Sequence, residues 1–193
     1  MNTIKSGILT ENIIKKSKFI SIALNVNSVQ ECEQKLTEYR KTYYDSNHVT
    51  FAYVVGVLER CSDDGEPSGT AGKPLLNIIK QKKLTNVLLI VVRYFGGIKL
   101  GAGGLVRAYN DSGVKALETA EVVELKRVIN ISFHINFEQA FNIYLLSNFG
   151  NFNIIERVGN DFIIECLPEK LDVVLKEIKK FNVSNIEIKE FTK

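Results

Sequence analysis

The sequence has no tryptophan, one methionine, two histidines and only three cysteines among 193 residues. Cys32, Cys61 and Cys166 lie far apart, so the chain offers no Cys-x-x-Cys pair for zinc. Their odd number also excludes a complete disulfide framework. We therefore expect these thiols to be buried or chemically idle.

Long apolar runs are also missing. No stretch approaches the roughly 20 apolar residues that a helix needs to cross a bilayer. The start, MNTIKSGILTENIIKKSKF, has no continuous apolar segment of the signal-peptide type. With 45% hydrophobic and 24% charged residues, the chain can still bury a core. We expect a globular cytoplasmic protein, of one large or two small domains, with no membrane partner.

Charge is distributed unevenly along the chain, although the formal net charge is only +3. The first 128 residues hold 18 Lys and Arg against 13 Asp and Glu, whereas the remaining residues hold 7 against 9. Only the first part is therefore mildly suited to an anionic partner such as nucleic acid.

The second part of the chain predicts a compact α/β pattern. ISFHINF, residues 131–137, alternates apolar and polar residues with the period of a strand, and a helix is expected at 138–149. Two strands follow around a turn at Gly159 and Asn160, and Pro168 suits the first turn of a second helix. NIEIKEF closes the pattern as a strand. The order βαββαβ is that of a ferredoxin-like domain over 132–193, joined to the first part at 128–131.

The first part, residues 1–128, predicts helices packed on a sheet. Paired strands are expected in LTENIIKKSKFISIALNV, and further strands in TFAYVVGVL and NVLLIVV. A helix at 28–41 begins with Ser28 and Glu31, which form a capping-box pattern. Further helices are expected from Pro74 to about Lys83 and at 103–119. In the last of these, one face should be buried, comprising Leu105, Tyr109, Gly113, Ala116 and Leu117.

Glycine is concentrated in two loops. Eight of the 13 glycines lie between Gly65 and Gly104, and each loop leads into a predicted helix. Glycine lets a ligand approach the backbone, and the first turn of a helix offers unpaired N–H groups with a partial positive charge. We therefore predict an anion cradle. Its cations would be Lys73, Arg93, Lys99 and Arg107, and its backbone donors would lie at Gly72, Gly101, Gly103 and Gly104. The alternative is that the glycines only permit tight turns and close helix packing, with Arg107 and Asp111 forming a surface ion pair.

The named nucleotide motifs do not fit. Pro67 stands where a Walker A loop needs its first glycine, and Pro74 replaces the hydroxyl residue that follows the lysine. Val106 stands where the dinucleotide fingerprint needs its third glycine. Three nearby aromatic residues, Tyr94, Phe95 and Tyr109, either stack bases or fill the core, and we favour the core for at least two.

The loop SDDGEPSGT carries Asp63, Asp64 and Glu66, which invites a magnesium or general-acid interpretation. The spacing does not match an EF-hand, and Asp-Gly and Glu-Pro are turn formers. A solvated acidic loop is therefore favoured, and we expect no metal. His48 is interpreted as a turn residue and His134 as a surface residue, so no catalytic residue is assigned.

Two segments, SDDGEPSGTAGKPLL and VVRYFGGIKLGAGGLVRAY, together resemble the signature of the YigZ/IMPACT family over about 35 residues. The resemblance implies an α+β protein of two domains. The first would be a left-handed βαβ domain, like domain IV of elongation factor G, a small-subunit ribosomal protein and the GHMP kinases. The second would be a ferredoxin-like domain similar to part of elongation factor G. It also implies a regulatory role in translation.

The sequence departs from these patterns at specific positions. Thr50 and Val54 stand where family members commonly have a cysteine and an arginine, which excludes thiol chemistry at that position. Val106, Arg107 and Ala108 replace the serines of the kinase phosphate loop, which argues against kinase activity.

Three functional hypotheses follow. The first is a non-enzymatic regulator that binds RNA or a ribosome-associated partner through the glycine-rich basic surface, without a cofactor. The second is a magnesium-dependent phosphotransferase or hydrolase that uses residues 63–66 and the glycine loops, which requires the two loops to converge. The third is a protein-interaction module whose glycine loops are purely structural.

Overall fold

The computed structural model describes residues 1–192, with the side chain of Thr192 excepted, and divides into two compact units, Met1–Glu124 and Leu125–Lys193. The expected joint at 128–131 lies inside strand β8 (Arg127–His134). The strand begins four residues before the alternating segment ISFHINF, because its first residues already pair with β10 and β11.

Unit 1 is built on a five-stranded sheet in which all neighbouring strands are antiparallel. The spatial order is β2 (Thr10–Ile14), β3 (Ser17–Asn25), β6 (Val87–Tyr94), β4 (His48–Val55) and β5 (Leu58–Ser62). The aliphatic run VLLIVV forms β6, and its residues are buried because helices cover both faces of the sheet. Two short strands, β1 (Asn2–Ile4) and β7 (Val122–Glu124), pair separately.

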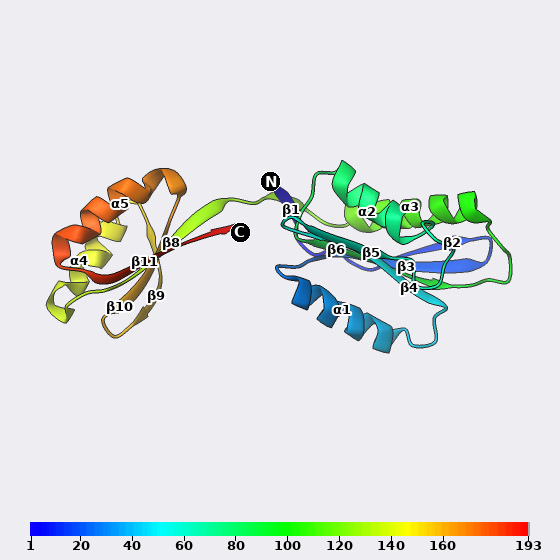
Figure 1. Cartoon of the computed structure of the whole chain (residues 1–193), viewed down its shortest axis with the longest axis horizontal. Coiled ribbons are helices and arrows are strands. Elements are labelled where there is room, and N and C mark those ends of the chain that lie inside the picture. The colour runs from blue at the N-terminus through cyan, green and yellow to red at the C-terminus, as the bar shows by residue number, and fades with distance from the viewer. Residues whose placement is uncertain (193) are drawn as a thin grey trace. The chain divides into compact units, whose positions relative to one another are not determined.

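Three helices cover the sheet of unit 1, with α1 on one face and α2 and α3 on the other (Figure 1). The helices are α1 (Val29–Thr42), α2 (Gly72–Gln81) and α3 (Ala102–Glu118). The Ser28 hydroxyl accepts from the Glu31 N–H at 3.1 Å, as the capping box predicts. The Glu31 carboxylate, however, accepts from the Asn27 N–H at 2.7 Å, one residue before the expected donor.

The predicted inner face of α3 is confirmed, because all five of its residues are buried. Tyr109 is fully buried and packs edge-on against Phe19, with ring centroids 5.3 Å apart. A β-carbon on Gly113 would come within 2.8 Å of the Leu75 side chain. Close packing of α3 on α2 therefore requires glycine at this position.

Unit 2 follows the predicted order of strands and helices. The elements are β8, α4 (Phe137–Ser147), β9 (Asn153–Val158), β10 (Asp161–Cys166), α5 (Leu171–Ile178) and β11 (Ser184–Thr192). The strands form one antiparallel sheet in the order β11-β8-β10-β9. Short 3₁₀ turns, Pro168–Lys170 and Lys179–Phe181, flank α5. Within residues 1–192, no helix is long and apolar enough to cross a membrane.

Candidate functional site

The loop between β6 and α3 leaves the first turn of α3 open. Gly101 caps the helix with φ +73° and ψ 164°, a conformation that glycine adopts far more readily than other residues. No side chain caps this end, and the first helical hydrogen bond runs from the Leu105 N–H to the Gly101 carbonyl at 2.9 Å. The N–H groups of residues 102–104 therefore have no acceptor in the described part of the chain.

A cavity of about 360 Å³ adjoins this end of α3. Its lining residues come from the acidic loop, from the end of β6 with the following loop, and from α3: Glu66, Pro67, Arg93, Phe95, Lys99, Leu100, Gly101, Ala102 and Leu105. The two predicted loops therefore converge, because Glu66 and Gly101 face one cavity.

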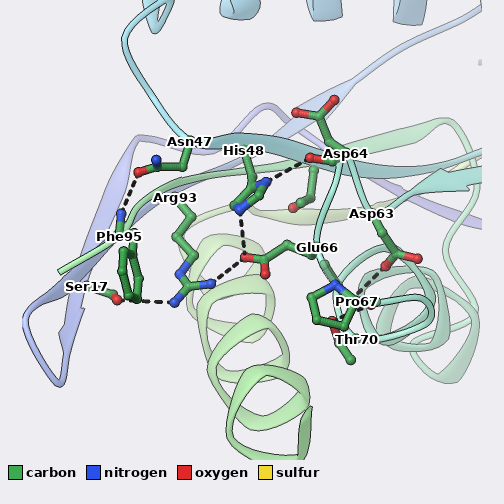
Figure 2. A network of polar contacts seen from close by, with 12 residues as sticks. Ser17, Asn47, His48, Asp63, Asp64, Glu66, Pro67, Thr70, Arg93 and Phe95 are labelled. Atoms are coloured by element: carbon green, nitrogen blue, oxygen red, sulfur yellow. Dashed lines mark hydrogen bonds and ion pairs between the residues drawn. The ribbon is translucent and has the colours of Figure 1, made fainter. Parts of the chain in front are cut away.

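Arg93 and Glu66, which line this cavity and which we call its floor, belong to a buried polar network (Figure 2). Nη1 of Arg93 donates to Oε1 of Glu66 at 2.6 Å, and the Tyr109 hydroxyl donates to the same oxygen at 2.7 Å. Nη2 of Arg93 also lies 3.3 Å from the Ser17 hydroxyl. Arg93 and Glu66 are only 4% and 7% exposed. The positive charge of Arg93 is thus neutralised within the protein.

Burial and the hydrogen bond to Glu66 both raise the pKa of Tyr109. This phenol therefore stays protonated and acts as a donor to the carboxylate. Its hydroxyl takes part in the core network and does not face a partner.

His48 contacts two parts of the acidic loop, although the sequence suggested only a turn residue. It is the first residue of β4, and its Nδ1 lies 2.8 Å from the Asp64 carbonyl oxygen. A carbonyl can only accept, so Nδ1 carries the proton. The other ring nitrogen, Nε2, lies 3.8 Å from Oε1 of Glu66.

The start of α2 differs from the start of α3, because Asp63 already caps it. The Asp63 carboxylate accepts from the N–H groups of Gly69, Ala71 and Gly72 at 2.8, 2.9 and 2.8 Å. Burial alone would raise the pKa of this carboxyl, but the three N–H donors outweigh it and lower the pKa. The Gly72 amide, predicted as part of the cradle, is therefore already engaged.

The acidic loop is held mainly by contacts within the protein. Asp64 accepts from the Val49 N–H at 2.6 Å, and its other oxygen lies 3.8 Å from the Arg40 guanidinium. Among the described residues, no group of three or more His, Cys, Asp or Glu side chains is arranged to hold a metal ion. The carboxylates act instead as caps and ion-pair partners.

A second hollow, of about 310 Å³, lies between α2 and α3. It is lined by Gly69, Lys73, Pro74, Asn77, Gln81, Val106, Arg107, Asn110 and Asp111. We call it the α2–α3 groove. It holds two of the predicted cations, Lys73 and Arg107, whereas Lys99 lies at the cavity. Arg107 makes no ion pair with Asp111 in the part of the chain described.

Two of the predicted glycines meet opposite surroundings. A β-carbon on Gly72 would lie 2.8 Å from backbone atoms of Ser62, so this glycine permits close packing. A β-carbon on Gly103 would meet nothing within 4 Å. Gly103 is thus free of packing constraints and faces open space at the start of α3.

Sequence reasoning missed several polar residues of this surface. Asn77 and Gln81 are spaced i, i+4 on α2 and line the groove with Asn110 of α3. That spacing was the available signal. Of the three aromatic residues, Tyr109 is fully buried and Tyr94 is half-buried against a core cluster, whereas Phe95 remains 44% exposed.

The thiols are poor nucleophiles at neutral pH. Cys32 and Cys166 are buried, and Cys61 lies on the exposed strand β5. Burial raises the pKa of Cys32 to about 11, and it also raises the pKa of Cys61 and of Cys166. All three thiols therefore stay protonated.

Comparison with known proteins places the similarity mainly in unit 1. The family model of the Impact N-terminal domain matches residues 15–117. The chain is 42% identical over 127 residues to "IMPACT family member YvyE" of Bacillus subtilis, an alignment that covers 64% of this chain and 58% of that protein. It is 39% identical over 132 residues to "IMPACT family member in pol 5'region" of Thermus thermophilus, covering 68% and 72%. The chain thus spans little more than half the length of the B. subtilis relative.

A solved structure, titled "Crystal structure of an hypothetical protein", resembles the chain over both units. It has a TM-score of 0.70 with 26% identity and covers 95% of this chain and 94% of that one. The similarity therefore extends to the mixed α/β architecture of the whole chain.

Proposed function

The chain belongs to the IMPACT family, since the matched domain covers more than half of it. From this premise we propose that the protein is a non-enzymatic, cytoplasmic regulator of translation that binds RNA. The binding surface would be the open start of α3 together with the α2–α3 groove. The uncapped first turn of α3 is the observation that carries the proposal, because its free N–H groups are available to donate to a ligand and its dipole favours a negative one.

Phosphate is the anion that best matches this surface. Lys99 lies beside the open turn, and Lys73 and Arg107 line the α2–α3 groove, so three cations are available to neutralise phosphates. Asn77, Gln81 and Asn110 add amide groups that donate to phosphate or sugar oxygens. Such contacts favour binding to a nucleic-acid backbone without strong sequence preference.

The strand orders of both units are compatible with the proposed likeness to translation-factor domains. In unit 1, β3 and β4 run parallel on either side of β6 and are joined through α1, which suits the proposed left-handed βαβ domain. In unit 2, the strand order β11-β8-β10-β9 suits the proposed ferredoxin-like domain. We propose both assignments on the strength of the family resemblance.

A magnesium-dependent phosphotransferase or hydrolase is the second candidate, and one observation favours it. Glu66 and Gly101 line the same cavity, so the acidic loop and the glycine loop meet as that chemistry requires. However, Oε1 of Glu66 holds Arg93, and Asp63 caps α2. A metal at Glu66 would lie beside the Arg93 guanidinium and be repelled by it, and a metal at Asp63 would displace the cap of α2. We therefore prefer the non-enzymatic function.

The salt dependence of RNA binding tests the proposal. Fluorescence anisotropy with a labelled single-stranded RNA should give a slope of log K against log salt of about −2, because each neutralised phosphate of a single strand contributes about −0.7. The variant Lys99→Ala with Arg107→Ala should weaken binding and bring the slope to about −0.7. Arg93 is left intact here because its charge is neutralised by Glu66.

The matched control is Lys41→Ala. Lys41 is an exposed cation on α1, which covers the opposite face of the sheet. It should leave both affinity and slope unchanged. Equal loss of affinity in the control and in the double variant would refute the proposed surface, and so would an unchanged slope in the double variant.

A further inference from the structure

We propose that the cavity beside α3 binds one unstacked nucleotide of single-stranded RNA, with its base inside and its phosphate at the rim. This inference rests on the proposed function, because it names the ligand unit that the same surface would hold.

Two atoms of the Arg93–Glu66 pair, which lines the cavity, have no hydrogen-bond partner in the described chain. Nε of Arg93 is buried and has no hydrogen-bond partner in the described chain. All contacts of the Glu66 carboxylate go to Oε1, so Oε2 is unpartnered among the described residues. An unpaired buried donor is costly, and a ligand that supplies an acceptor removes that cost. The polar edge of a nucleobase offers a donor and an acceptor side by side.

The walls suit a flat apolar ring. Pro67, Phe95, Leu100 and Leu105 line the cavity, and its volume of about 360 Å³ lies within the range of small-molecule sites, roughly 300–1,000 Å³. The Arg93 guanidinium lies over the Phe95 ring at 5.5 Å from its centroid and holds it in place. Phe95 nevertheless stays 44% exposed. An aromatic ring held in this way is a stacking platform for a base.

The rim supplies the positive charge. Gly101 and Ala102, at the open start of α3, lie at the cavity together with Lys99. Arg93 and Glu66 form a neutral pair at the floor, so the floor does not attract a phosphate. The charge pattern therefore fixes one orientation, with the base inward and the phosphate on the first turn of α3.

The α2–α3 groove favours a polymer over a free nucleotide. The same two segments line both hollows, since Pro67 and Leu105 line the cavity whereas Gly69 and Val106 line the groove. Lys73 and Arg107 in the groove would then bind the phosphates of neighbouring nucleotides. A free nucleoside monophosphate would leave both cations unused.

Two variants that change the cavity and remove no charge test this inference. Phe95→Ala removes the stacking ring, and Ala102→Trp places a large side chain at the mouth. Each should weaken binding of labelled single-stranded RNA about 10-fold or more while the salt slope stays near −2, because Lys73, Lys99 and Arg107 all remain to neutralise phosphates. Tyr44→Ala, which removes an 85% exposed aromatic of the same unit, is the matched control and should change nothing. Thermal unfolding of each variant establishes that it is folded.

Competition with small probes shows whether the cavity binds a whole nucleotide or only a phosphate group. A nucleoside 5′-monophosphate should displace the RNA at a much lower concentration than inorganic phosphate does, and Phe95→Ala should abolish that difference. If RNA binds with the expected slope but Phe95→Ala and Ala102→Trp have no effect, the inference is wrong and the proposed function stands. If mononucleotides bind and RNA does not, or if neither binds, both are wrong.

Discussion

Replacing Gly103 by alanine should stabilise the protein and weaken RNA binding at the same time. Gly103 is the second residue of α3, and an added β-carbon meets no atom within 4 Å. The substitution therefore introduces no clash. Alanine is favoured over glycine in a helix by about 0.5–1 kcal/mol, because glycine loses more backbone entropy on folding.

The expected size of both effects follows from this geometry. For a unit of this size, a gain of about 0.5–1 kcal/mol raises Tm by roughly 2–5 °C. The new methyl group would stand in the space through which a phosphate approaches the first-turn amides of α3. We expect about 10-fold weaker binding, equivalent to about 1.4 kcal/mol.

Calorimetry gives the Tm, and anisotropy with a labelled single-stranded RNA gives the affinity. Thr37→Ala is the matched control, because it also exchanges an exposed residue for a better helix former, on α1 at the opposite face of the sheet. It should leave the affinity unchanged. If Gly103→Ala raised Tm and bound RNA as tightly as the parent protein, a close approach of phosphate to this turn would be refuted.

Further variants test the acidic loop and the packing of α2. The pKa of Asp63 is lower in the folded protein than the ordinary 3.8. The ionised Asp63 carboxylate therefore contributes fully to stability above pH 3.8, and this contribution is lost as the pH falls through the pKa of the folded protein. Asp63→Asn should thus lower the free energy of unfolding in urea by about 2 kcal/mol at pH 7. The difference in stability between the variant and the parent protein should shrink below pH 3.8. Glu66→Leu should lower the free energy of unfolding by about 3–5 kcal/mol, because it leaves the charge of Arg93 buried and unpaired. Adding Arg93→Met should restore part of that loss, because no lone buried charge then remains. A double variant whose loss equals the sum of the two single losses would contradict this. Gly72→Ala should destabilise by about 1–3 kcal/mol, because its β-carbon would lie 2.8 Å from the Ser62 backbone; unchanged stability would contradict it.

Local patterns predicted much of the fold. The period of apolar residues gave the buried face of α3 and the order of elements in unit 2, and the capping box gave the start of α1. These features depend on residues within one or two turns of each other. The beginning of β8 was missed because its first residues are recognised only by their pairing with β10 and β11.

Long-range pairing limited the prediction of the candidate site. Both glycine loops lead into helices, but only one of those helices begins with free N–H groups. Asp63 reaches the Gly72 amide across nine residues, and Glu66 meets Arg93 across 27. Tyr109 joins that pair from a further element, 43 residues from Glu66. Sequence spacing alone does not indicate which cation is neutralised internally and which remains exposed.

The most direct test is an NMR titration of the ¹⁵N-labelled full chain with a short single-stranded RNA. We expect the amide signals of Ala102, Gly103 and Gly104 to shift most, and the shifts to diminish as salt is added. The Gly72 amide, which already donates to Asp63, should shift little. Shifts confined to other elements, with residues 102–104 unchanged at saturating RNA, would contradict the claim that the start of α3 receives an anion.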